Sequence, residues 1–228
     1  MEKLLVKDKD IVVPGQELAR SIEYVPTGGC FRDNDSIISS KLGLVSINGR
    51  VINIIPLTGK YIPKEGDIVI GKIIDIGFNG WYLDIGCPYD ASLMIKDATE
   101  FIDKGADLSQ FYDFNELVIA KVVKITRFSN INISTKGPGL RKIKGGKIID
   151  ITPSKVPRLI GKQGSMINLL KENTNCRITV GQNGMVWIQG DNSDDELLAT
   201  EAILKIENES HLDGLTDKIK EFLERKRK

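Results

Sequence analysis

The spacing of apolar residues changes character near residue 140 of this chain. Up to about residue 136, apolar residues occur in short runs separated by glycine, asparagine and proline, which is typical of β-strands joined by turns. From about residue 147, strand-like runs alternate with apolar residues at helical spacing, which is typical of an α/β domain. The sequence therefore predicts a multidomain β and α/β protein. We expect a small all-β domain at 1–65, a second β domain at 66–136, an α/β domain at 147–207 and a basic helix or tail at 208–228.

Turn residues indicate how the β regions are organised. In the first region, the pair Asn48–Gly49 lies between two apolar runs and predicts a hairpin. The second region contains five apolar runs with an irregular insertion after the third. Five antiparallel strands of this length favour a closed barrel, which leaves no long unpaired edge. The five runs are 68–76, 81–85, 91–95, 117–125 and 130–134. The glycine-rich segment 137–146 then predicts a connector without regular structure.

Basic residues are concentrated in one segment, although the whole chain is almost neutral. The 228 residues contain 32 Lys and Arg against 31 Asp and Glu, a net charge of +1. Between Lys136 and Lys171, nine basic residues accompany a single acid, Asp150, so this segment carries +8. The remaining 23 basic and 30 acidic residues carry −7. A polyanion responds to the local field rather than to the average, so the segment predicts a contact with nucleic acid.

The composition argues against several other classes of protein. Cys30, Cys87 and Cys176 form no C-x-x-C pair, so we expect neither a disulfide framework nor a zinc ribbon. The single histidine argues against a His-rich metal centre and a Ser-His-Asp hydrolase, and no cofactor is predicted. No apolar stretch approaches the ~20 residues of a membrane helix, and the charged first residues lack the apolar region of a signal peptide. We therefore expect a cytoplasmic protein that does not bind a membrane.

The most informative motif is a four-residue turn with glycine at both ends, Gly161-Lys-Gln-Gly164. We expect it to join two helices. Glycine lacks the Cβ atom that would keep another backbone at a distance. The second helix would direct its free N–H groups and the positive end of its dipole to the same place. Lys155, Arg158 and Lys162 add positive charge. The pattern predicts a turn against which a sugar–phosphate backbone can lie.

Residues 156–206 resemble a KH domain. Ile160-Gly-Lys-Gln-Gly-x-x-Ile167 matches the Ile-Gly-x-x-Gly-x-x-Ile core of that family. An apolar helix, a strand, an Asn183–Gly184 hairpin and a last helix, which Asp194 is expected to cap, follow in order. The resemblance implies a domain that clamps about four nucleotides of single-stranded RNA. Its RNA-binding residues would be Gly161, Lys162, Gln163, Gly164, Arg158 and Lys155.

The region 66–136 resembles an S1-type RNA-binding barrel, a form of the OB fold. The matching segments are Gly71-Lys-Ile, Asn79-Gly-Trp-Tyr-Leu-Asp-Ile-Gly86 and Ala120-Lys-Val-Val-Lys-Ile125. The resemblance implies that bases stack on exposed aromatic rings while basic residues follow the backbone. Alternation along the strand places at least one of Phe78, Trp81 and Tyr82 inside, and we favour Tyr82 over Trp81 as exposed. The RNA-binding residues of the barrel would be Tyr82, Lys121, Lys124 and Arg127.

The order of the three domains resembles the RNA-binding cap subunits of the archaeal exosome. The resemblance covers nearly the whole chain and includes Val13-Pro-Gly15, Ile55-Pro-Leu57 and Thr135-Lys-Gly-Pro-Gly-Leu140. It implies that the N-terminal domain docks on a hexameric ring of phosphorolytic exoribonuclease subunits, which carries three cap subunits. The chain would have no active site. It would bind single-stranded RNA and feed 3′ ends into the pore for 3′-to-5′ degradation, with a preference for A-rich tails in some relatives.

Two alternatives stay open at this point. S1 and KH domains also occur together in transcription and translation factors, which usually carry two KH domains after the barrel. About 20 residues follow the first one here, too few for another. The enzyme-class alternative is a self-sufficient ribonuclease. Carboxylates such as Asp84, Asp90 and Asp97 are plentiful, but no pattern marks a set of them as convergent.

Overall fold

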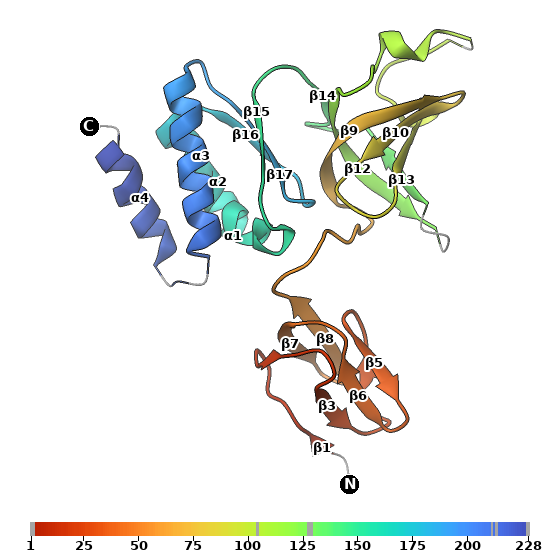
Figure 1. Cartoon of the computed structure of the whole chain (residues 1–228), viewed down its shortest axis with the longest axis vertical. Coiled ribbons are helices and arrows are strands. Elements are labelled where there is room, and N and C mark those ends of the chain that lie inside the picture. The colour runs from red at the N-terminus through yellow and green to blue at the C-terminus, as the bar shows by residue number, and fades with distance from the viewer. Residues whose placement is uncertain (1–2, 104, 127–129, 211, 213, 227–228) are drawn as a thin grey trace. The chain divides into compact units, whose positions relative to one another are not determined.

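The computed structural model describes residues 3–103, 105–126, 130–210, 212 and 214–226 (Figure 1). The chain divides into two compact units, residues 1–59 and residues 60–228. The first unit is built from strands alone in its described part, and the second combines a barrel with an α/β domain. This confirms the predicted multidomain β and α/β architecture: a small all-β domain, a five-stranded barrel and an α/β domain.

Two small sheets make up the first unit. Their strand orders are β1-β3-β6-β5 and β2-β7-β8-β4. The strands are β1 Lys3–Leu4, β2 Ile11–Val12, β3 Glu17–Arg20, β4 Val25–Pro26, β5 Cys30–Asp33, β6 Ser36–Ser39, β7 Gly43–Asn48 and β8 Val51–Pro56. Both sheets contribute to one apolar core, in which Val12, Leu18, Ile37, Val45 and Ile52 are buried.

The hairpin predicted at Asn48–Gly49 is confirmed, with its turn one residue farther along the chain. Asn48 is the last residue of β7 and pairs with Val51 of β8, so the turn consists of Gly49 and Arg50. Gly49 has a φ of +60°, a left-handed value that glycine adopts without strain. A two-residue hairpin of this kind prefers glycine at the first turn position, which explains the location.

Five strands of the second unit close into a barrel. The order around it is β13-β11-β10-β9-β12, and β12 pairs again with β13 to complete the circle. The strands are β9 Ile68–Gly77, β10 Gly80–Asp84, β11 Ala91–Met94, β12 Leu117–Ile125 and β13 Ile131–Ser134. The insertion expected after the third strand contains two 3₁₀ turns, Ile95–Asp97 and Leu108–Gln110.

The segment 137–146 contains a strand, which corrects the prediction of a structureless connector. Arg141–Ile143 forms β14, which pairs antiparallel with the first half of β12. Leu140 and Ile143 are buried. The glycines on either side do break regular structure, but burial of these two apolar side chains holds Arg141–Ile143 in a strand. Tertiary packing therefore overrides the turn signal here.

The C-terminal part of the second unit is a three-stranded antiparallel sheet with helices on one face (Figure 1). The strand order is β15-β17-β16. The elements are β15 Lys147–Asp150, α1 Val156–Ile160, α2 Ser165–Thr174, β16 Arg177–Val180, β17 Met185–Gln189, α3 Ser193–Asn208 and α4 Leu215–Lys226. Along β17, Val186 and Ile188 pack into the core beneath the helices. Trp187 between them lies on the opposite face of the sheet and belongs to a different apolar cluster.

The two last helices differ in detail from expectation. Helix α3 begins at Ser193 with Asn192 at its cap position, so Asp194 lies in the first turn and does not cap the helix. Its charge still faces the positive end of the helix dipole. Helix α4 is an integral part of the domain, because Leu215, Ile219 and Leu223 repeat at helical spacing and are buried in the shared core.

Candidate nucleic-acid interface

The turn between α1 and α2 has a backbone that depends on glycine. Gly161 has a φ of +74° and a ψ of +174°, a region that is open essentially to glycine alone. A Cβ atom at this position would lie 2.7 Å from the backbone nitrogen of Met166, so Gly161 also allows α1 to pack closely on the start of α2. Gln163 and Gly164 have left-handed φ values of +52° and +80°. As a result, Lys162 and Gln163 are exposed at the surface of the turn.

The two glycines of the turn serve different purposes. The sequence suggested that both keep space free for an approaching backbone, but at Gly161 that space is filled by the chain itself. At Gly164, a Cβ atom would find its nearest neighbour, the Cγ2 atom of Ile167, at 3.8 Å. Gly164 is therefore needed for its φ value and borders open space. A ligand could approach the turn on the Gly164 side.

Uncompensated positive charge surrounds the turn. Helix α2 starts directly after Gly164, which has no side chain to cap it, so the positive end of the helix dipole lies at the turn. Arg158 and Lys162 are exposed, and Lys155 is half-buried. None of the ion pairs found among the described residues involves these three side chains. Dipole and cations together create a local anion-binding surface.

On the barrel, two of the predicted residues lie on one outward-facing row. Tyr82 of β10 is opposite Ser92 of β11, which is in turn opposite Asn132 of β13. Asn132 is opposite Lys124 of β12. Residues directly opposite each other on neighbouring strands project from the same face. The row therefore brings an aromatic ring, two polar side chains and a cation together over about 14 Å, at ~4.8 Å per strand. We call it the Tyr82–Lys124 row.

Sequence reasoning missed Ser92 and Asn132, although a signal for them was present. Both residues are half-buried. Ser92 lies between the fully buried Ala91 and Leu93, and Asn132 follows the fully buried Ile131. Alternation thus marks them as outward-facing positions of barrel strands. What the sequence could not supply is the pairing of β11 with β13, which places the two side chains next to each other.

The three aromatic residues of this region have distinct environments. Trp81 is fully buried, and its indole Nε1–H donates hydrogen bonds to the backbone oxygens of Leu108 (3.3 Å) and Tyr112 (3.0 Å). Its ring meets that of Tyr112 edge to face, with centroids 4.9 Å apart. Tyr82 is 44% exposed, which confirms the preference for Tyr82 as the outer residue, and Phe78 is 95% exposed. Trp81 is therefore the centre of the barrel core.

The exposed ring of Tyr82 rests on a glycine. A Cβ atom at Gly77 would lie 3.0 Å from the Cε2 atom of Tyr82, so a side chain at position 77 would push the ring away. With glycine there, the Cδ2–Cε2 edge of the ring lies close to β9, while 44% of the side chain remains exposed. Glycine in a strand interior often marks such a close approach.

The other two predicted barrel residues, Lys121 and Arg127, are not part of this row in the described structure. Lys121 is exposed on β12 but pairs with Ser134, so it lies outside the Tyr82–Lys124 row. Arg127 lies outside the described residues. The structure thus brings Tyr82 and Lys124 together, places Lys121 on the same strand as Lys124, and gives no position for Arg127.

Part of the basic segment 136–171 holds the protein together. The Lys142 ammonium forms an ion pair with Glu116 and donates to the backbone oxygen of Phe111. Although burial works against ionisation, the pKa of Glu116 lies below its ordinary value because the Asp113 N–H and Lys142 both donate to its carboxylate. Arg141 lies over the ring of Trp187, 5.5 Å from its centroid. Lys142 is therefore occupied by intramolecular contacts, whereas Arg141 contacts one ring and remains exposed.

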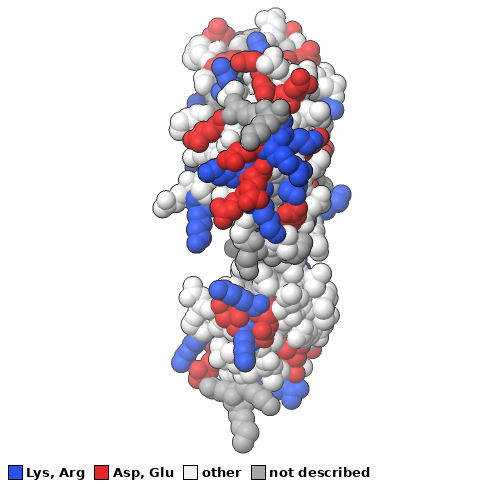
Figure 2. Space-filling model, turned by 90° about the vertical axis from the view of Figure 1, so that its left-hand side faces the viewer, with Lys and Arg blue, Asp and Glu red and all other residues white. Residues whose placement is uncertain are grey.

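The C-terminal helix is less basic than its last residues suggested. Within α4, four basic residues accompany three acids, and Lys226 pairs with Glu201 of α3 at 2.9 Å. Figure 2 shows basic and acidic side chains intermixed on one face of the second unit. The lack of a uniform positive surface there leaves the glycine-ended turn as the better candidate for a contact with a polyanion.

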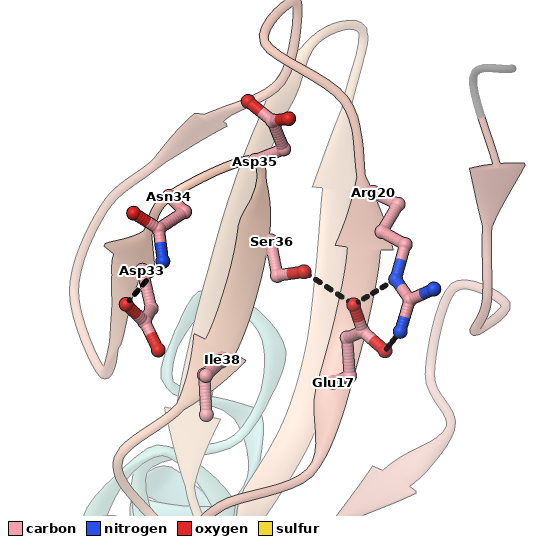
Figure 3. Close-up of a pocket in the computed structure, with 7 residues that line it drawn as sticks. All are labelled: Glu17, Arg20, Asp33, Asn34, Asp35, Ser36 and Ile38. Atoms are coloured by element: carbon pink, nitrogen blue, oxygen red, sulfur yellow. Dashed lines mark hydrogen bonds and ion pairs between the residues drawn. The ribbon is translucent and has the colours of Figure 1, made fainter.

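An open hollow in the first unit does not resemble a nucleic-acid site (Figure 3). It is lined by Glu17, Arg20, Asp33, Asn34, Asp35, Ser36 and Ile38. The Glu17 carboxylate accepts hydrogen bonds from the Arg20 guanidinium and the Ser36 hydroxyl, which hold its pKa below the usual range. Three carboxylates against one paired cation would repel a phosphate backbone.

The described part of the chain contains neither a cluster of metal-ligating side chains nor a thiol with a lowered pKa. There, no group of three or more His, Cys, Asp or Glu side chains could hold a metal ion. The three cysteines are free thiols, and burial raises the pKa of each, which makes them poor nucleophiles. None of the described helices is long and apolar enough to cross a bilayer.

Comparison with known proteins agrees with this geometry. Residues 60–124 match the family model described as the S1 domain of RRP4, and residues 146–194 match the KH domain model. The chain is 49% identical over 227 residues to the exosome complex component Rrp4 of Thermococcus kodakarensis, covering 98% of this chain and 88% of the relative. The same component of Pyrococcus abyssi is 50% identical over 227 residues, covering 98% and 85%.

A solved structure extends the comparison to three dimensions. The crystal structure of a protein named as a putative exosome complex RNA-binding protein matches this chain with a TM-score of 0.67 at 36% sequence identity. The match covers 74% of this chain and 98% of that one.

We predict that the two turn glycines differ in their tolerance of alanine. Gly164→Ala places a side chain in the left-handed region and should lower the free energy of unfolding by about 1–2 kcal/mol. Gly161→Ala should cost more, because it adds a contact of 2.7 Å with the Met166 nitrogen to a backbone conformation that only glycine favours. Urea denaturation of both variants measures the difference. Equal losses would contradict the close packing of α1 on α2.

Proposed function

This chain belongs to the Rrp4 family of exosome components, and we propose that it is the non-catalytic RNA-binding subunit that caps a hexameric ring of phosphorolytic exoribonuclease-like subunits. Three such subunits would surround the pore, bind single-stranded RNA and feed 3′ ends inward for 3′-to-5′ degradation in the cytoplasm. The observation that carries the proposal is the exposed turn Gly161–Gly164, where unpaired cations and the start of α2 meet.

The turn offers what a phosphate backbone requires. The positive end of the α2 dipole can attract phosphate oxygens, and Lys162 and Arg158 can neutralise their charge. Because these contacts involve the backbone of the RNA, they carry little sequence information. A preference for A-rich RNA would have to arise where bases are contacted.

The Tyr82–Lys124 row supplies a place for bases. The exposed Tyr82 ring can stack a base, and Ser92 and Asn132 can form hydrogen bonds beside it. Lys124 at the end of the row can contact a phosphate. The chain would thus hold one RNA strand at two separate surfaces, both within its second unit.

The first unit presents a surface suited to a protein partner. Ile11 of β2 is opposite Leu44 of β7, which is opposite Ile55 of β8, so the three share one sheet face. The neighbours Val12, Val45 and Ile54 are buried on the opposite face. Ile11 and Ile55 are 65% and 51% exposed. Exposed aliphatic side chains in a continuous row are typical of protein interfaces, and we propose this row as the contact with the ring.

Reversal of charge at the turn is predicted to weaken RNA binding. Lys162→Asp combined with Gln163→Asp should lower affinity for single-stranded RNA at least about tenfold, because two carboxylates would face the phosphates. Fluorescence anisotropy at fixed salt measures the affinity. Both positions are exposed, so the melting temperature should stay close to that of the wild type.

A matched variant controls for net charge. Lys171→Asp with Asn175→Asp makes the same two types of substitution at exposed positions at the far end of α2, and Asn175, like Gln163, has a left-handed φ. This variant should bind RNA nearly as well as the wild type. Equal loss in both variants would indicate a general charge effect and would remove the turn from the RNA path.

Assembly with the ring is predicted to depend on the apolar row of the first unit. Ile55→Asp should abolish co-elution of the chain with ring subunits in size-exclusion chromatography, because a carboxylate would be buried without a partner. Phe31→Asp on β5 of the other sheet, where the side chain is 48% exposed, is the matched control and should assemble normally. Assembly of the Ile55 variant would rule out this row as the docking surface.

The absence of catalysis is tested directly by RNA decay. The purified chain should leave single-stranded RNA intact, with inorganic phosphate or with a divalent metal ion. Ring subunits with phosphate should degrade it, and addition of the chain should increase the rate at low RNA concentration, because the cap raises the local concentration of substrate. Robust decay by the chain alone would overturn the proposal and favour a self-sufficient ribonuclease.

A further inference from the structure

Strand β9 contains a β-bulge beside Tyr82. Tyr82 of β10 pairs with Asp75 of β9. The next residue of β10, Leu83, pairs with Ile73, so β9 contains one residue more than β10 at this point, Ile74. An extra residue in one strand interrupts the alternation of inward and outward side chains and can redirect a side chain. The bulge therefore decides which side chains surround the Tyr82 ring.

The effect of the bulge is to turn Asp75 to the outside of the barrel. Strict alternation from the buried Ile73 would direct residue 74 outward and residue 75 inward. In the structure both Ile74 and Asp75 are exposed, and Ile76 packs against the barrel core instead. Asp75 thus projects from the same face as Tyr82, its partner on the neighbouring strand. A carboxylate therefore lies next to the Tyr82 end of the Tyr82–Lys124 row.

A second bulge lies at the opposite end of the row. In β12, Val123 is the extra residue, and Lys124 pairs with Asn132 of β13. Val123 and Lys124 are both exposed. The acid beside one end of the row and the cation at the other end are thus each turned outward by a bulge, and the uncharged residues of the row lie between them.

The Asp75 carboxylate can accept a hydrogen bond from a ligand. Its Oδ1 accepts the N–H of Ile76 at 2.8 Å, which restrains the side chain. Within the part of the chain that the structure describes, no donor reaches its Oδ2 and no cation pairs with it. An ionised carboxylate accepts hydrogen bonds and donates none. A group bound beside the Tyr82 ring therefore needs a donor on the side of Asp75.

The charges at the two ends give a bound nucleotide a direction. Lys124 attracts phosphate, whereas Asp75 repels it. A nucleotide whose base stacks on Tyr82 would therefore keep its sugar and phosphate toward Lys124 and extend its base toward Asp75. The Watson–Crick edge of a base lies away from the sugar. This edge, which single-stranded RNA leaves free for recognition, would face the carboxylate.

We propose that Asp75 is a specificity-determining residue that accepts a hydrogen bond from the exocyclic amino group of the base on Tyr82. Adenine, cytosine and guanine carry such a donor. Uracil has a carbonyl oxygen on each side of its single N–H donor, and the carboxylate repels these oxygens. The site therefore favours RNA whose bases bear amino groups and disfavours uracil. This inference rests on the proposed function, because it requires RNA at the Tyr82–Lys124 row.

The test compares two RNAs that differ at the base edge. Cytosine and uracil have rings of the same size, but cytosine bears an amino group where uracil bears a carbonyl oxygen. The probes are oligocytidylate and oligouridylate of about eight nucleotides, twice the length that one KH domain clamps. Fluorescence anisotropy with the full chain at fixed salt gives both affinities. The wild type should bind oligocytidylate about fivefold more tightly, as expected for one partly exposed hydrogen bond.

Asp75→Asn is the decisive variant. The asparagine amide keeps an oxygen for the Ile76 N–H, so the bulge should be retained, but its NH2 group can donate to a uracil oxygen. The ratio of the two affinities should therefore fall at least about threefold. Asp103→Asn removes the same charge from an exposed position in the insertion after β11 and should keep the wild-type ratio. An unchanged ratio in the Asp75 variant, including an equal gain for both RNAs, would overturn the proposal.

Lys124→Ala separates the phosphate contact from base recognition. It should weaken binding of both RNAs by the same factor, because a phosphate contact carries no sequence information. Loss of discrimination in this variant would contradict the direction assigned to the base and overturn the proposal. If the wild type binds neither RNA, the proposed function fails and this inference fails with it. If the wild type binds both RNAs equally, RNA binding stands and only the role of Asp75 is overturned.

Discussion

The hydrogen-bonding requirement of one strand, β9, organises the second unit. Its backbone groups are shared among β12 on one side, β10 along part of the other side, and the side-chain amide of Asn183 where β10 has ended. Unpaired backbone groups in a buried position are costly, so each of these partners is needed where it stands. The barrel therefore completes the bonding of its longest strand with a residue from the domain that follows it.

This arrangement divides the outer surface of the barrel into two regions. Around Ile70 and Ile119, the outer face is buried against Trp187 and serves as a joint. Across β10, β11 and β13, the outer face remains free and carries the Tyr82–Lys124 row. Two regions of one small barrel thus have different tasks, and the proposed RNA surface lies on the part that the α/β domain leaves uncovered.

Local patterns in the sequence predicted the elements well but not their partners. The Asn183–Gly184 pair correctly indicates a hairpin, yet the destination of the Asn183 side chain, 113 residues away at Ile70, has no local signature. A weaker signal was present in the uninterrupted apolar runs at the start of β9 and β12, since a barrel strand with one solvated face should alternate. Those runs mark strands that are buried on both faces.

The basic segment 136–171 shows that the charge of a residue in the sequence also does not predict its tertiary partner. Sequence alone gives Lys142 and Lys162 equal weight, but Lys142 pairs with Glu116 and Lys162 is exposed at the turn. Which cation is free depends on the pairing of β14 with β12, a contact that its glycine-rich surroundings concealed. Phosphate-facing and structural cations can be separated only once tertiary contacts are known.

The support of the Tyr82 ring by Gly77 limits what the barrel can discriminate. One edge of the ring lies close to Gly77 of β9 and 44% of the side chain is exposed, so a stacked base would rest on this one aromatic platform. Every nucleobase presents a comparable flat face, so such a platform is indifferent to base identity. Any preference of the proposed RNA surface for particular bases would therefore have to come from the polar side chains beside the ring, Asp75, Ser92 and Asn132.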